Sequence, residues 1–407
     1  MTGDAHDGLR RQALSLICLG VVGALTTWFS ATAILPDLIR QNGLTPTEAA
    51  WFTNAVQLGF VVGALLTSLV NLPDLVRMNR LIAVSAVLAA LANALLLTDP
   101  PPLLAILARF ATGVALAGVY PPALKLMATW FVKGRGLALG FLIGALTLGS
   151  SMPHLFRALM GGADWRTVVL LSSGACLLAA VLFGLAISEG PYPFGKATFN
   201  PAQIVKVLGS KPVFLANLGY FGHMWELYAM WAWILAFLNA AAKGLTLIPF
   251  GSVSMFSFVI VASGFIGCLI GGFLSDRIGR CFTTAGMMAV SGLCAVLIGF
   301  VFAGPAWLLA LIAIVWGIAI IGDSAQFSAA VTELSDQRLV GTALAMQMAI
   351  GFALTVVAIW LTPLFADAIG GWQWAFLLLV PGPLIGIAAM LLLRRLPDAA
   401  RLAHGAR

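Results

Sequence analysis

The sequence predicts an all-α membrane protein of twelve transmembrane helices, arranged as two pseudo-symmetric six-helix bundles. Its composition is the first observation, because 61% of the 407 residues are hydrophobic and only 9% are charged. A water-soluble domain carries roughly a quarter of charged residues, so most of this surface must face lipid. The other two observations are a series of long apolar runs and a repeat that relates the two halves of the chain.

The apolar runs define the predicted helices in order. A helix needs roughly 20 apolar residues to cross about 30 Å of hydrocarbon. Backbone groups inside lipid must be hydrogen-bonded within their own segment, so these runs are predicted to be helices. Polar turns separate them, such as DPPP from Asp99 and KGRG from Lys133. The runs lie near residues 12–35, 48–70, 81–98, 103–126, 136–159, 167–188, 213–239, 251–275, 281–303, 307–332, 340–365 and 374–394.

The basic residues predict the orientation. If the N-terminus is cytoplasmic, most of the 22 lysines and arginines fall in inner segments, and the outer loops hold only Arg40, Arg166 and Lys243. This positive-inside bias predicts a multi-pass protein of the cytoplasmic (inner) membrane with both termini in the cytoplasm. The net charge of +7 is explained by this topology and by the lipid bilayer as a partner, so it requires no nucleic acid.

A repeat relates the two halves. GALLTSLVNL from Gly63 aligns with GGFLSDRIGR from Gly271, and ADWRTVVLL from Ala163 aligns with GGWQWAFLLL from Gly370, at nearly the same offset. A constant offset between distant landmarks indicates a duplicated six-helix unit. The predicted organisation is an N-terminal six-helix bundle (1–188), a cytoplasmic central loop (189–212) and a C-terminal six-helix bundle (213–407).

Two motifs resemble those of a known family. GGFLSDRIGR at 271–280 closely resembles the loop signature of the major facilitator superfamily, at the place between the eighth and ninth helices where that family carries it. RFATGVALAG at 109–118 resembles the family's fourth-helix motif. The resemblance covers the whole chain. It implies the major facilitator fold and a monomeric secondary transporter, not an enzyme, that alternates between inward-open and outward-open states around a central cavity.

The loop signature also implies a conformational latch. In similar proteins its aspartate helps to close the cytoplasmic side by meeting the positive end of a neighbouring helix. The first-half copy has Ser68 and Leu69 where the family has aspartate and arginine. We therefore expect Asp276 to act alone, near the start of the fifth helix around Gly136, unless the basic residues of the motif serve only topology. The predicted latch residues are Gly271, Asp276, Arg277, Gly279 and Arg280.

Few ionisable residues lie inside the predicted spans, where each costs roughly 2.5 to 3.5 kcal/mol to insert. The resemblance implies that the first, fourth, seventh and tenth helices line the cavity, and three of them carry Arg109, Glu226 and Asp323. The substrate and proton-coupling candidates are Glu226, His223, Arg109 and Asp323. Further cavity candidates are Thr27, Trp28, His154, Arg157 and Gln326.

Glu226 is the leading candidate because its position along the seventh run places it near the bilayer midplane, and His223 shares its helix face. Desolvation penalises the charged form of a carboxylate, so a midplane glutamate can serve as a proton carrier. Each candidate has a structural alternative. Glu226 could be merely hydrogen-bonded between helices, and Arg109 could bind an anion or be satisfied by backbone carbonyls. Asp323 could join helices as polar glue, and Arg157 could extend to the outer interface.

These residues favour proton-coupled uptake of a small organic anion. The alternatives are a proton-coupled exporter of lipophilic or cationic drugs and a non-transporting nutrient sensor on the same scaffold. The sequence contains no Walker-type nucleotide motif and no H-E-x-x-H spacing, so neither ATP hydrolysis nor a metal-dependent hydrolase is predicted. We expect no cofactor and no metal; the expected partners are a small-molecule substrate and H+.

Overall fold

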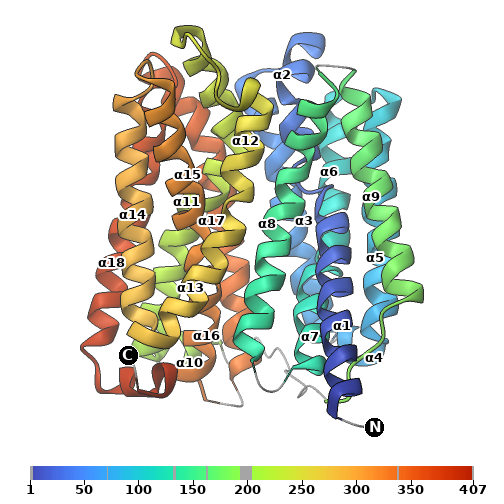
Figure 1. Ribbon diagram of the computed structural model, residues 1–407, viewed down its shortest axis with the longest axis vertical. Helices are drawn as coiled ribbons and strands as arrows, with labels where there is room; N and C mark the ends of the chain where they lie inside the picture. The colour runs from blue at the N-terminus through green and yellow to red at the C-terminus, as the bar shows by residue number, and fades with distance from the viewer. Residues whose placement is uncertain are drawn as a thin grey trace.

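The computed structural model describes residues 3–70, 72–131, 134–161, 164–192, 204–336 and 339–405, and these residues form helices and short connections without any strand. The long helices stand roughly side by side (Figure 1). The chain begins and ends at the same end of the molecule, which we call the lower end, and the opposite end is the upper end (Figure 1). Both termini at one end of the molecule agree with an even number of membrane-spanning segments.

The first half of the chain forms nine helices among the described residues. They are α1 (Gly3–Leu25), α2 (Ser30–Asn42), α3 (Pro46–Leu69), α4 (Leu72–Leu75), α5 (Met78–Ala94, extended by η1, Leu95–Thr98), α6 (Pro102–Leu116), α7 (Tyr120–Trp130), α8 (Arg135–Leu159) and α9 (Trp165–Leu185). Contacts between α1, α3, α5, α6, α8 and α9 hold this half together.

The second half repeats this plan. Its helices are α10 (Ile204–Gly209), α11 (Lys211–Ala241), α12 (Val253–Ala262), α13 (Gly264–Ile278), α14 (Arg280–Phe300), α15 (Ala306–Gly322), α16 (Ser324–Leu334), α17 (Val340–Ala368) and α18 (Pro381–Arg394), with short turns η3 (Ala242–Gly244), η4 (Pro249–Gly251), η5 (Ala375–Leu379) and η6 (Pro397–Gly405). The halves meet where α3 packs on α17 and where α8 packs on α12 and α13. Of the predicted central loop, residues 193–203 lie outside the described residues.

Eleven helical segments in the described part of the chain are long and apolar enough to cross a membrane. The twelfth predicted crossing is α11, which has 31 residues. Its histidine, glutamate, asparagines, tyrosines and tryptophans lower its hydropathy, and most of its residues are buried by other helices. Because α11 faces little lipid, it does not need the apolarity of the other crossings. The predicted all-α fold of twelve crossings is confirmed.

Four predicted helices are each broken in two: α1/α2, α6/α7, α12/α13 and α15/α16. Pro121 and Pro122 at the start of α7 explain the second break, since proline cannot donate a backbone hydrogen bond to the preceding turn. The last break falls at Asp323, between Gly322 and Ser324. Each pair still forms one segment long and apolar enough to cross a membrane, and broken helices are typical of membrane proteins where they line a cavity or pack on protein.

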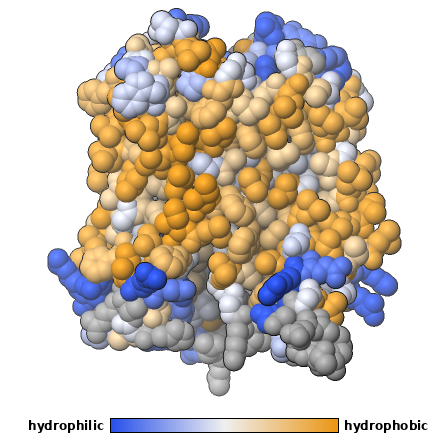
Figure 2. Space-filling model, viewed as in Figure 1, coloured by the Kyte–Doolittle hydropathy of each residue, from blue (hydrophilic) through white to orange (hydrophobic). Residues whose placement is uncertain are grey.

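The outer surface is apolar across the middle of the molecule and hydrophilic at both ends (Figure 2). Large apolar side chains such as Leu185, Leu178 and Leu103 are left exposed by the packing of the helices. A belt of this kind on an all-helical protein is the surface that faces lipid, and the charged ends correspond to the two membrane interfaces.

Candidate functional site: two cavities and the seal between them

A cavity of about 520 Å³ lies in the lower half of the molecule, between the two halves of the chain. Its walls come from α7, α8, α11, α16 and α17, and they extend down to Gly136 and Glu333 near the lower end. The polar side chains on the wall are few: Tyr120, Lys125, Tyr220, Tyr228, Ser324, Ser328, Thr332 and Glu333. The remaining wall is apolar and aromatic, which suits a small solute with an apolar body.

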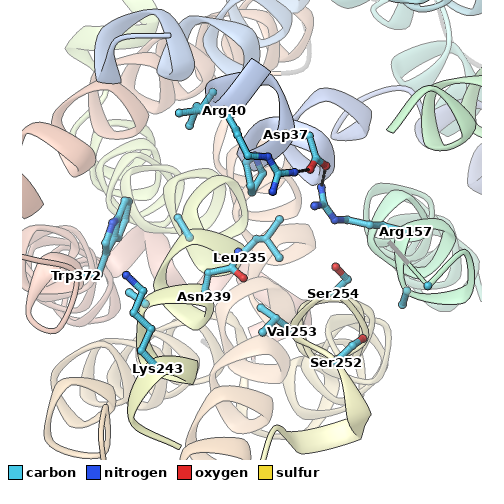
Figure 3. Close-up of a pocket in the computed structure, with 16 residues that line it drawn as sticks. Asp37, Arg40, Arg157, Leu235, Asn239, Lys243, Ser252, Val253, Ser254 and Trp372 are labelled. Atoms are coloured by element: carbon cyan, nitrogen blue, oxygen red, sulfur yellow. Dashed lines mark hydrogen bonds and ion pairs between the residues drawn. The ribbon is translucent and has the colours of Figure 1, made fainter. Parts of the chain in front are cut away.

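A second cavity of about 620 Å³ lies at the upper end. Figure 3 shows its charged side chains, which come from α2, α8 and η3. Asp37 forms ion pairs with Arg40 and with Arg157, the latter at 2.7 Å. Lys243 lies on another part of the wall, near Trp372 (Figure 3). Three cations and one carboxylate therefore line this cavity, so it carries a net positive charge.

An aromatic seal separates the two cavities. We define it as Trp28, Phe29, Phe60, Tyr228, Trp231 and Phe352, which come from the α1/α2 break, α3, α11 and α17. The Phe60 and Phe352 ring centroids are 4.6 Å apart, and those of Tyr228 and Trp231 are 5.5 Å apart. Tyr228 and Phe352 also form part of the lower cavity's wall. The seal therefore bridges the two halves and closes the top of the lower cavity.

The contact between α8 and α13 loosens toward the lower end. A Cβ atom added to Gly144 would lie 2.5 Å from the Phe265 ring, whereas one added to Gly140 would lie 3.7 Å from the Cys268 carbonyl oxygen. One added to Gly136 would meet no atom within 4 Å. The two halves thus pack tightly near the middle and diverge below it, so this is a state open toward the lower end.

Glu226 lies behind the cavity wall. Its carboxylate accepts hydrogen bonds from Ser291 Oγ and Trp316 Nε1, both at 2.8 Å, and the residue is 1% exposed. These partners belong to α14 and α15, inside the second half, and Glu226 lines neither cavity. The sequence predicted its burial near the middle of α11 but placed it in the central cavity. Glu226 lies instead on another face of α11, because Tyr220, Met224 and Tyr228 occupy the face that lines the cavity.

His223 and Asp323 meet on the same side of α11. His223 Nδ1 lies 2.9 Å from Asp323 Oδ1, and both side chains are buried. Asp323 Oδ1 has no hydrogen-bond partner in the described chain, so this close contact becomes an ion pair only when His223 is protonated. Asp323 occupies the α15/α16 break. The structure therefore brings His223 and Asp323 together, one turn of α11 from Glu226, which the sequence did not predict.

Arg109 is fully buried and bonded to protein groups. Its guanidinium donates to the Trp28 carbonyl oxygen at 2.5 Å, to Asn93 Oδ1 at 2.6 Å, to Ser30 Oγ at 3.1 Å and to the Phe52 carbonyl oxygen at 3.4 Å. It lines neither cavity. Of the two interpretations from the sequence, this geometry favours the arginine satisfied by backbone carbonyls, and its role is to hold the α1/α2 break in place.

The loop signature forms a network at the lower end of the second half. Arg280 binds Glu333 with two hydrogen bonds, at 2.5 and 2.8 Å, and donates to Gln326 Oε1 at 2.6 Å. Gln326 therefore belongs to this network and lines neither cavity. Arg277 stacks over the Phe273 ring at 4.2 Å. Arg280 thus does more than set topology, since it ties α14 to α16.

The glycines of the signature have separate roles. A Cβ on Gly271 would lie 1.7 Å from the Gly322 carbonyl oxygen, so only glycine allows α13 to approach the α15/α16 break this closely. Gly279 has a φ of 83°, in the region that favours glycine. Asp276 is exposed, and no described residue forms an ion pair with it. The predicted meeting with the start of α8 is absent from this lower-open state.

The remaining candidates lie along the upper half. Arg157 does not extend to lipid; it lines the upper cavity and also donates to the Ala33 carbonyl oxygen at 2.5 Å. Thr27 is buried in the α1/α2 break, donates to the Ala24 carbonyl oxygen at 3.0 Å and lines neither cavity. His154 is buried on α8. Trp28 belongs to the aromatic seal.

Several residues of these sites have no clear signal in the sequence. Asp37 and Glu333 lie just beyond the ends predicted for the first and tenth runs, where a charge looks like any other loop charge. Ser291 and Trp316 could not be predicted as partners of Glu226, because nothing about an uncharged side chain in an apolar run indicates which residue it will contact. Lys243 stands out only as an outer-loop charge.

Comparison with known proteins agrees with this architecture. A family model described as Major Facilitator Superfamily matches residues 17–344 and 250–407. Two solved structures of a bacterial homolog to the human lysosomal transporter Spinster, both inward-facing, are similar in fold. The unoccupied form has a TM-score of 0.66 with 15% identity and covers 98% of this chain and 97% of its own. The occupied form has a TM-score of 0.70 with 15% identity and covers 95% and 97%.

Curated relatives are more distant in sequence. The chain is 21% identical over 287 residues to the probable sulfoacetate transporter SauU of Cupriavidus necator, covering 66% of this chain and 65% of that protein. It is 21% identical over 308 residues to the niacin transporter NiaP of Acinetobacter baylyi, covering 65% and 66%. The chain therefore spans about two thirds of the length of these relatives.

Proposed function

Because the chain belongs to the major facilitator superfamily, we propose that it is a secondary active transporter that moves a small organic anion together with protons by alternating access. Its lower end, which holds both termini, faces the cytoplasm of a cell whose inner membrane it spans. Transport in the inward direction follows from an upper cavity that collects the anion and a lower cavity that releases it.

The aromatic seal is the observation that carries this proposal. Two cavities on one axis, closed from each other by stacked rings from both halves, form one state of an alternating-access cycle. Because α8 and α13 diverge toward the lower end, rocking of one half against the other can close the lower cavity and part the seal. A channel does not need two cavities with a closed centre between them, so this arrangement favours a transporter.

The charge of the upper cavity supports an anion. Arg40, Arg157 and Lys243 outnumber Asp37 there, and a cleft of one sign between low-dielectric walls concentrates counter-ions. The curated relative named for sulfoacetate is named for such an anion. The apolar wall of the lower cavity agrees with a short aliphatic or aromatic body attached to the charged group.

The buried groups behind α11 support proton coupling. Glu226 and the His223 and Asp323 pair can change charge only by taking up or releasing a proton. Each change alters the packing of α11 on α14 and α15 or at the α15/α16 break. Coupling requires that protonation and substrate bias the same conformational equilibrium. We propose that these groups provide that bias although they line neither cavity.

The proposal is tested by uptake into proteoliposomes with an imposed pH gradient, against a panel of small carboxylates and sulfonates that includes sulfoacetate and nicotinate. We expect accumulation of at least one anion that collapses when a protonophore removes the gradient. Lys243→Gln should raise its half-saturating concentration severalfold, and Lys243→Arg should not, since charge is retained.

The panel also contains lipophilic cations, because the aromatic and apolar wall of the lower cavity with Glu333 would also suit export of such molecules. If the pH gradient drives the movement of cations and of no anion, the protein is a proton-coupled exporter of lipophilic cations and the anion proposal is wrong. Binding without movement of any member would indicate a sensor.

A further inference from the structure

A continuous face of α8 runs from the lower cavity to the upper one. Leu139, Ile143 and Leu146 line the lower cavity, and Arg157 lines the upper cavity. The spacing of three and four residues keeps all of them on one side of the helix. Ser150 and His154 continue the same spacing in the gap between the two cavities, and both are buried.

Helix α11 has a matching face. Tyr220, Met224 and Tyr228 line the lower cavity, and Leu235 and Asn239 line the upper one. Trp231 lies between them at the same spacing and belongs to the aromatic seal. The two faces therefore mark one path through the molecule, which is closed at the level of these intervening residues.

The groups on the closed part of the path have unpaired polar atoms. Trp28 Nε1, Ser150 Oγ, His154 Nδ1 and Trp231 Nε1 are buried and have no hydrogen-bond partner within the described chain. Gln57 lies on α3 one turn above Phe60, which packs on Trp28 in the seal, and both of its amide atoms are unpaired too. We call these five residues the polar layer. Buried polar groups in proteins are normally paired, so five residues with unpaired polar atoms along or beside the closed part of the path require an explanation.

We infer that the polar layer is a binding surface for the oxyanion group of the transported solute, which is exposed only when the upper end opens. This inference rests on the proposed transport function and assigns the solute's contacts within it. In the state described here the surface is shut, and its polar atoms are buried without hydrogen-bond partners in the described chain.

The chemistry of the layer selects the ligand. An indole nitrogen can only donate a hydrogen bond, and the glutamine amide, the serine hydroxyl and the histidine can donate as well. No carboxylate belongs to the layer. Arg109 lies beside it, since it donates to the Trp28 carbonyl oxygen. A surface rich in donors, reached through a cationic cavity, fits the oxygens of a carboxylate or sulfonate and disfavours a cation.

The test uses cysteine labelling of purified full-length protein. Ser150→Cys is compared with Ser151→Cys, its neighbour on α8, whose hydroxyl donates to the Leu148 carbonyl oxygen at 2.7 Å and lies off the path face. The probes are the anionic sulfonatoethyl and the cationic trimethylammonioethyl methanethiosulfonate, and labelling of the five native cysteines is subtracted. We expect severalfold faster labelling of Ser150→Cys, with the anionic reagent favoured once both rates are normalised to a free thiol.

Equal and negligible labelling of both positions would mean that the layer is permanent packing and would overturn the inference. Faster labelling by the cationic reagent would overturn the ligand class. Neither outcome depends on transport. If the labelling is as expected while no solute is moved in proteoliposomes, the transport proposal fails and the binding surface remains.

A second measurement uses two tryptophans of α11. Trp231→Phe removes an unpaired N–H group, whereas Trp233→Phe removes an N–H group that donates to the Ile359 carbonyl oxygen at 2.9 Å. Both changes remove the same atoms. We expect Trp233→Phe to lower Tm and Trp231→Phe to lower it clearly less. An equal fall in Tm would show that the Trp231 N–H group is satisfied in the resting protein, contrary to the inference.

Discussion

Arg109 illustrates how a single buried charge can organise the backbone around it. Its guanidinium has five N–H donors in a planar fork, and four oxygen atoms from the α1/α2 break, α2, α3 and α5 accept hydrogen bonds from it. Arg109→Lys keeps the charge but not the fork, so several of these buried oxygens lose their donor. We expect a loss of roughly 3 kcal/mol in the free energy of unfolding, of the size seen when a buried charged network is broken.

Thermal unfolding in detergent measures this effect, with Arg80→Gln as an exposed control that should leave Tm unchanged. An unchanged Tm for Arg109→Lys or Arg109→Gln, together with a severalfold rise in half-saturating substrate concentration, would instead return Arg109 to the role of an anion-binding residue.

Glu226 is the residue to which the proposed function assigns proton coupling. Glutamine can replace it with little loss of packing, because its oxygen can accept from Trp316 and its amide can donate to the Ser291 hydroxyl. Glu226→Gln mimics the permanently protonated form. We expect accumulation driven by a pH gradient to be abolished while counterflow exchange stays measurable and Tm changes little.

The measurement is a paired uptake and counterflow assay in the same proteoliposomes. Accumulation in response to an imposed proton gradient by Glu226→Gln would show that this carboxylate is structural, and the same assay would then be applied to Asp323→Asn.

Among the helices, α13 shows how close packing depends on one missing side chain. Gly271 and Gly272 are neighbours in sequence, but a Cβ on Gly271 would meet the Gly322 carbonyl oxygen at 1.7 Å, whereas a Cβ on Gly272 would meet nothing within 4 Å. We expect Gly271→Ala to lower the free energy of unfolding by roughly 2 kcal/mol through overpacking, and Gly272→Ala to have no such cost.

Thermal unfolding of the two variants compares the same chemical change in two packing environments. Similar Tm values for both would mean that α13 and the α15/α16 break can separate without cost, and close packing would then not explain the glycine at position 271.

Helix α11 divides two tasks between its faces. One face lines the transport path with Tyr220, Met224 and Tyr228, and the other carries His223 and Glu226 into the second half. A rotation or shift of α11 therefore acts on both the path and the buried charges. Under the proposed coupling, protonation of Glu226 or His223 would affect the path although neither side chain lines a cavity.

At the scale of the whole molecule, the loop signature should act in the state opposite to the one described. Asp276 is exposed here, and the first turn of α8 around Gly136 has open space beside it. Closing the lower end brings α13 toward α8, where the carboxylate can meet the positive helix terminus. We expect Asp276→Asn to reduce transport severalfold without a change in Tm, because only the lower-closed state loses an interaction.

The control is Ser68→Ala, at the equivalent position of the first half, which should transport nearly as well as the wild type. Equal and mild effects of the two substitutions on initial uptake rates would show that the signature has no latch role that depends on Asp276.

Much of this architecture was determined by the sequence itself. The crossings could be predicted because lipid requires long apolar runs with internally bonded backbones, and the repeat follows from landmarks such as Gly63 and Gly271. The cost of burying charge also singles out Glu226, His223, Arg109 and Asp323 from their positions along the apolar runs alone. Each of these signals is local or periodic along the chain, so composition and spacing reveal it.

The tertiary structure alone decided what those residues face. The rotation of α11 sends Glu226 to Ser291 and Trp316 instead of the cavity, and the α15/α16 break brings Asp323 to His223. It also assembled the aromatic seal from four distant segments. These outcomes depend on how a helix is turned about its axis and on which helices lie beside it. Packing between segments far apart in the chain sets both, and no single stretch of sequence records them.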